Sequence, residues 1–67
     1  MHVNILLFEG LTQLDMTGPY EVLAAAPGFT VDFVAKTLAP VRSDRGLRFV
    51  PTQTLDSAPP CDLLVAP

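Results

Sequence analysis

The amino-acid sequence predicts an α/β fold with a mostly parallel sheet. Residues 2–8, HVNILLF, form a nearly unbroken apolar run that stops at Glu9-Gly10, which is typical of a buried central strand. Apolar residues then recur at spacings of three and four up to Pro27-Gly28, which indicates a helix. A β-branched and aromatic run at residues 29–37 predicts a second strand. Strand, helix and strand in this order make the βαβ unit of a parallel sheet.

The helix is predicted to begin near Thr12 and to kink at Gly18-Pro19. Five residues at helical spacing define one face of it, which we expect to be packed: Leu11, Leu14, Gly18, Val22 and Ala25. The alternative is a helix that begins at Pro19, because a first turn tolerates a residue without a backbone N–H.

After the second strand, the sequence predicts a small hairpin. Residues 43–46, Ser-Asp-Arg-Gly, form a four-residue turn between short arms at residues 41–42 and 47–50. Pro51 confines the second arm to an edge, because proline cannot donate to a neighbouring strand.

The last part of the chain predicts a connector at residues 56–60 and a further buried strand at residues 62–66, DLLVA. Three core strands and one helix leave one sheet face uncovered, and parallel sheets are rarely stable in that form. We therefore expect residues 1–67 to be the N-terminal part of a single larger α/β domain.

The composition excludes several classes of protein. Seven acidic and four basic side chains give a formal charge of −3, which argues against a nucleic-acid partner. The four basic residues lie within one short stretch, as a local basic patch or as a solvated hairpin surface: Lys36, Arg42, Arg45 and Arg48. No targeting signal is visible and the first apolar run is too short to span a bilayer, so we expect a cytoplasmic protein with no membrane partner.

The strongest candidate for chemistry is Asp15. The segment from Glu9 to Asp15 follows the carboxyl end of the first strand, and open parallel sheets bind ligands at that edge. Asp15 is therefore a candidate catalytic acid, and Gly10 and Thr12 are candidate substrate-binding residues. Thr12 to Asp15 also matches the T-x-x-D capping box, so a structural role for Asp15 as a helix cap is the alternative, and the two roles are compatible.

Other reactive side chains are less well placed. Cys61, the one cysteine, precedes a strand and so lies at the opposite edge of the sheet, where we expect a buried and inert thiol. No two His, Cys, Asp or Glu residues have the spacing of metal ligands, and no glycine-rich phosphate loop follows the first strand. The sequence thus predicts no metal and no cofactor.

Several segments together resemble the beginning of the ThiJ/PfpI superfamily of class I glutamine-amidotransferase-like proteins. They are the strand end LLFEG, the motif LD-x-x-GP-x-E at residues 14–21, the stretch VRSDRGLRFVPTQTL and the final DLLVAP. The resemblance covers essentially the whole chain, and within the superfamily it is nearest to the bacterial isonitrile hydratases.

The resemblance implies a flavodoxin-like three-layer α/β sandwich, a homodimer, and a small-molecule substrate. It also implies a cysteine nucleophile on a strand-to-helix turn beyond Pro67, with Asp15 as the acidic residue that points at it. The implied reaction is the hydration of an isonitrile to an N-substituted formamide, which is hydro-lyase chemistry.

Other members of the superfamily have two other activities, which are alternatives for this chain. The same domain opens many AraC-type transcriptional regulators, where it senses ligands ahead of a helix-turn-helix pair and often carries LD-x-x-GP-x-E. A glyoxalase or chaperone-like activity fits less well, because that branch usually carries glutamate at the position of Asp15.

Overall fold

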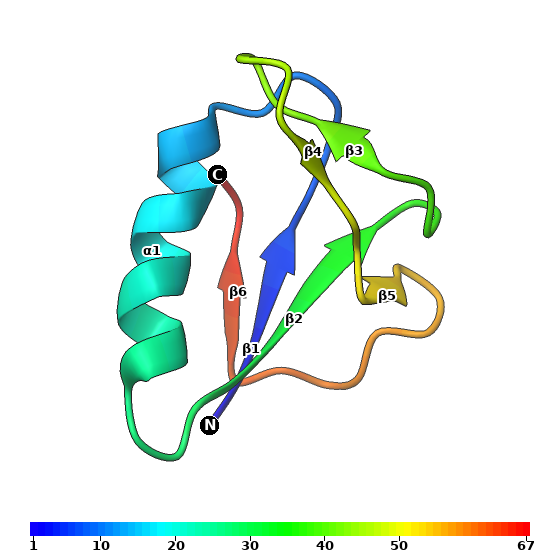
Figure 1. Cartoon of the computed structure of the whole chain (residues 1–67). Helices are drawn as coiled ribbons and strands as arrows, with labels where there is room; N and C mark the ends of the chain where they lie inside the picture. Colours follow the sequence, from blue (N-terminus) through cyan, green and yellow to red (C-terminus); the bar gives the residue numbers. More distant parts are fainter.

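The computed structural model describes residues 1–67, and it places one helix against one face of a parallel sheet (Figure 1). The elements in chain order are β1 (His2–Leu6), α1 (Gln13–Ala25), β2 (Thr30–Ala35), β3 (Val41–Arg42), β4 (Arg48–Phe49), β5 (Gln53–Thr54) and β6 (Leu63–Val65). No helix of the structure combines the length and the apolar character needed to cross a membrane.

The main sheet has four strands in the order β5-β2-β1-β6, and all its pairings are parallel. The βαβ unit and the central place of β1 are thereby confirmed. The hairpin is confirmed as well, since β3 and β4 pair antiparallel in a separate two-stranded ribbon. Strand β5 is not predicted by the sequence, because Gln53 and Thr54 have no apolar pattern and become a strand only by pairing with Val34 and Ala35.

The core lies between the sheet and α1. Alternate residues of β1 and its extension, Val3, Ile5 and Leu7, point to this side and are buried. Met16 of α1 is also buried, and the ring of Tyr20 meets the ring of Phe33 edge-on with centroids 4.8 Å apart.

The predicted packed face of the helix is wrong. Met16 is 1% exposed and packs in the core with Tyr20 and Leu23, whereas Leu14 is 73% and Val22 71% exposed. Met16, Tyr20 and Leu23 are also spaced by four and three, so the helix is apolar on two faces and periodicity alone cannot choose between them.

The helix runs from Gln13 through Pro19 to Ala25, so the alternative start at Pro19 is wrong. Pro19 has no N–H with which to donate the helical hydrogen bond to the carbonyl oxygen of Asp15.

The opposite face of the sheet carries a polar network around His2. The ring atom Nε2 lies 3.1 Å from Oδ2 of Asp32 and 2.9 Å from Oδ1 of Asn4, and both oxygens are acceptors, so Nε2 carries the proton. The other ring nitrogen lies 2.7 Å from Oγ1 of Thr30, and Nδ2 of Asn4 donates to the carbonyl oxygen of Pro59 at 2.9 Å. These bonds fasten β1 to β2 and to the connector before β6.

Candidate active site

The strand order identifies where a ligand would bind. From β1 the chain passes through α1 to β2 on one side, and it later returns as β6 on the other side. In open parallel sheets, ligands generally bind beyond the carboxyl ends of the two strands that flank such a reversal, which here are β1 and β6. The helix α1 begins at this same edge (Figure 1).

Asp15 lies in the first turn of α1 at the carboxyl edge of the sheet. Its backbone N–H donates to the carbonyl oxygen of Thr12 at 3.0 Å, and its carboxylate takes part in no ion pair within the chain. Successive helical residues differ in direction by about 100°, so Asp15 points away from the core that its neighbour Met16 enters. The side chain of Asp15 is exposed. It can therefore contact a substrate or a further part of the domain.

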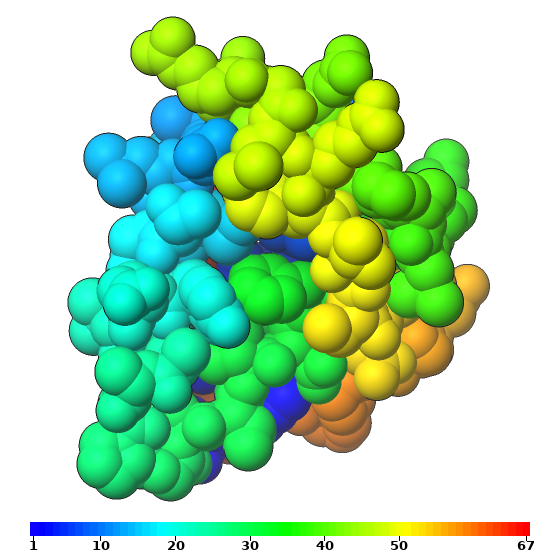
Figure 2. Space-filling view, viewed as in Figure 1, coloured from blue at the N-terminus to red at the C-terminus, as the bar shows by residue number.

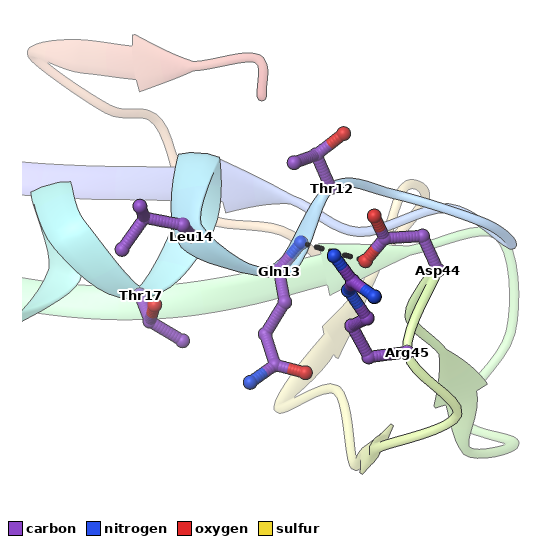
Figure 3. Close-up of a pocket in the computed structure, with 6 residues that line it drawn as sticks. All are labelled: Thr12, Gln13, Leu14, Thr17, Asp44 and Arg45. Carbon is purple, nitrogen blue, oxygen red and sulfur yellow. Dashed lines mark hydrogen bonds between the residues drawn. The ribbon is translucent and has the colours of Figure 1, made fainter.

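The predicted capping box is wrong, because Thr12 makes no side-chain cap bond although it occupies the cap position. The cap comes from the hairpin: Oδ1 of Asp44 accepts the backbone N–H of Gln13 at 3.2 Å (Figure 3). The Oγ of Ser43 donates to Oε1 of Gln13 at 3.1 Å, and the N–H of Asp44 donates to the carbonyl oxygen of Leu11 at 2.8 Å.

Sequence reasoning missed Asp44 as the cap because it stands 31 positions from Gln13, and the T-x-x-D pattern considers only neighbouring residues. The one available signal was an acidic residue in a predicted turn, and that says nothing about which helix it serves.

The connection from β1 to α1 is held against β3. Gly10 has φ of +79°, a conformation that side chains disfavour, and its N–H donates to the carbonyl oxygen of Arg42 at 2.9 Å. Glu9 Oε1 accepts the N–H of the same Arg42 at 3.2 Å. The N–H of Gly10 is thus occupied within the chain, and a substrate contact of Gly10 stays a prediction.

A polar hollow of about 350 Å³ opens between the start of α1 and the hairpin turn. Six residues line it, as Figure 3 shows: Thr12, Gln13, Leu14, Thr17, Asp44 and Arg45. The structure therefore brings Thr12 to a hollow, but Asp15 and Gly10 do not line it. A substrate role for Thr12 likewise stays a prediction.

The thiol of Cys61 lies at the amino edge of the sheet, where the N–H of the next residue, Asp62, donates to the carbonyl oxygen of His2 at 2.8 Å. The predicted burial of Cys61 is wrong, because the connector that carries it runs over the surface and leaves the thiol exposed. No group of three or more His, Cys, Asp and Glu side chains is gathered closely enough to hold a metal ion.

Comparison with known proteins settles the family. A model of the DJ-1/PfpI family matches residues 1–67. The chain belongs to this family. Isonitrile hydratase of Pseudomonas putida is 43% identical to it over 67 residues, which are 100% of this chain and 29% of that protein. The chain thus spans less than a third of the length of this isonitrile hydratase.

Solved structures confirm the flavodoxin-like fold class. A ThiJ/PfpI family protein from Pseudomonas syringae superposes with a TM-score of 0.94 at 37% identity, over 98% of this chain and 28% of that one. A DJ-1 superfamily protein from Agrobacterium tumefaciens, at 22% identity and a TM-score of 0.86, shares the fold over 100% of this chain and 37% of its own. An AraC family transcriptional regulator from Pseudomonas putida matches with a TM-score of 0.79 at 29% identity, over 97% of this chain and 44% of that one.

Proposed function

We propose that residues 1–67 are the N-terminal part of a single DJ-1/PfpI domain that hydrates isonitriles to N-substituted formamides. The observation that carries this proposal is the 43% identity, over the whole chain, to isonitrile hydratase. The exposed carboxylate of Asp15 at the carboxyl edge of the sheet supports it. We further propose a cytoplasmic homodimer that needs no metal or organic cofactor.

In this proposal, a cysteine from the remainder of the domain supplies the nucleophile. Its thiolate adds to the terminal carbon of the isonitrile, so that a C–S bond forms and negative charge develops on that carbon. Asp15 in its protonated form delivers a proton to the carbon, which leaves a thioimidate on the cysteine. General acid catalysis of this kind contributes about 10²–10⁴-fold to a rate.

Water completes the reaction. The Asp15 carboxylate takes one proton from the water molecule as the water oxygen attacks the thioimidate carbon, which restores the acid. The second proton of the water passes to the imine nitrogen. The C–S bond then breaks, the thiolate leaves, and the product is an N-substituted formamide. One isonitrile and one water are consumed for each formamide, and no electrons are exchanged.

The test uses the intact protein that carries this chain, with cyclohexyl isocyanide as the probe and formation of N-cyclohexylformamide as the measurement. Asp15→Asn should lower kcat by about 10²–10⁴-fold, because the amide can neither give nor take the proton. Glu21→Gln is the matched control, since Glu21 is an exposed acid of the same helix and should leave kcat unchanged. Turnover by Asp15→Asn at the parent rate would exclude the proposed role of Asp15, and absence of turnover by the parent protein would exclude the activity.

Ligand sensing in a transcriptional regulator is the second candidate. The AraC family regulator that shares this fold at 29% identity supports it. The two candidates separate in one further measurement, an electrophoretic mobility assay of the intact protein with duplex DNA. The hydratase proposal expects isonitrile turnover and no retained DNA, whereas a regulator retains DNA in a ligand-dependent manner.

A further inference from the structure

The β3–β4 ribbon carries positive charges that the chain does not neutralise. Arg42 and Arg48 are direct partners across the ribbon. The adjacent Ser43 donates its N–H to the carbonyl oxygen of Leu47 at 2.8 Å, so the arginine pair is of the non-hydrogen-bonded kind, in which facing side chains come closest.

Both arginines point outward on the same side of the ribbon. Side chains alternate along a strand, and their neighbours Val41 and Phe49 pack against the core. Like charges directly opposite each other destabilise an antiparallel pair. No carboxylate lies within ion-pair distance of either guanidinium group, so this repulsion is not relieved by a direct salt bridge.

The two arginines also share a hollow. Its volume is about 330 Å³, and Glu9, Pro40, Arg42 and Arg48 line it. The ribbon projects at the upper edge of the molecule in the space-filling view, where residues of the yellow-green part of the chain stand free (Figure 2). Glu9 is held in place, because its Oε1 accepts the N–H of Arg42 at 3.2 Å.

We propose that this hollow binds a phosphate group between Arg42 and Arg48. Guanidinium groups present several N–H donors in a fixed fork, and one fork takes two oxygens of an anion. A carboxylate has only two oxygens and is satisfied by one arginine, whereas a phosphate offers enough oxygens for two. The pair of facing arginines therefore selects phosphate over carboxylate.

Glu9 lowers the affinity of this hollow for phosphate. Its carboxylate opposes the two guanidinium charges and leaves a net charge of +1 among the lining side chains. Replacing it with glutamine keeps an oxygen for the N–H of Arg42 and removes the negative charge. The hollow is distinct from the hollow lined by Thr12, and its proposed ligand does not depend on the chemistry of Asp15.

The test is calorimetric titration of the intact protein with inorganic phosphate at constant ionic strength, with acetate as a second arm. Arg42→Gln and Arg48→Gln should each weaken phosphate binding by about tenfold or more, because each removes charge-assisted hydrogen bonds. Arg45→Gln is the matched control on the same ribbon, since Arg45 lines a different hollow, and it should leave the affinity unchanged. Glu9→Gln should tighten binding several-fold.

Two results would overturn the proposal. The first is an unchanged phosphate affinity in every variant, or no phosphate binding by the parent protein. Either result would mean that the two arginines are only solvated. The second is acetate binding as tight as phosphate binding, which would exclude selection by two forks. Circular dichroism of each variant checks that the variant is folded, so that a loss of affinity is not caused by unfolding.

Discussion

At the scale of single residues, the start of α1 contributes to both the fold and the proposed chemistry, but different side chains have the two roles. Asp44 from the hairpin satisfies the N–H of Gln13, so Asp15 is not needed as a cap. Thr12 contributes no side-chain bond to the helix start. The carboxylate that spacing alone would assign to the helix end is therefore free for another partner.

The cap can be tested by substitution of Asp44. We expect Asp44→Ala to lower the free energy of unfolding by about 0.5–2 kcal/mol, because it removes the acceptor for the N–H of Gln13. Asp44→Asn keeps an acceptor oxygen and should cost less. Thr12→Ala should cost only a few tenths of a kcal/mol, as no cap bond is lost. Urea denaturation of the intact protein measures all three, and a larger cost for Thr12→Ala than for Asp44→Ala would restore the capping box.

At the scale of elements, α1 has one apolar face on the sheet and a second one directed outward. Met16, Tyr20 and Leu23 form the inner face, and Leu14 and Val22 belong to the outer one. Packing of the inner face against the sheet sets the rotation of α1 about its axis. Leu11, which the spacing pattern places on the predicted helical face, lies outside the helix and forms an isolated bridge with Ser43.

Paired substitutions in α1 distinguish its two faces. Met16→Ala should lower the free energy of unfolding by about 2–5 kcal/mol, because it leaves a cavity in the core. Leu14→Ala should cost less than about 1 kcal/mol, since an exposed side chain loses little packing. Chemical denaturation of the intact protein gives both values. Equal costs would mean that Leu14 is covered in the intact protein.

At the scale of the whole molecule, stability is concentrated in the centre of the sheet. β1 is bonded to β2 on one side and to β6 on the other, and Val3 and Ile5 are fully buried. The β3–β4 ribbon makes no strand pairing with this sheet and carries facing arginines. Local opening should therefore be easiest in the ribbon and hardest in β1.

Hydrogen exchange followed by NMR checks this gradient. We expect the backbone amides of β1 to exchange most slowly and those of the β3–β4 ribbon to exchange much faster, because the ribbon opens without breaking the parallel sheet. Added phosphate should slow exchange in the ribbon and leave β1 unchanged. Ribbon amides as well protected as those of β1 would contradict this description.

The sequence alone determined the elements with strong local signals. The apolar run of β1, the βαβ order, the hairpin turn at residues 43–46 and the existence of the final strand follow from periodicity and turn residues, and the family follows from LD-x-x-GP-x-E. The predicted burial of the final strand is wrong, because Leu63 and Leu64 of β6 are exposed at the edge of the sheet. The position of Asp15 at the carboxyl edge followed from the same order of elements.

Only the tertiary structure decided features that depend on residues distant in sequence. The cap by Asp44, the outward face of Leu14 and the existence of β5 each arise from contacts with another segment of the chain. Local spacing predicts the period of a helix but not its rotation about its own axis. It also cannot identify a hydrogen-bond partner that is 31 positions away in the sequence. Packing against the sheet and closure of the hairpin supply that information, because both depend on the whole fold.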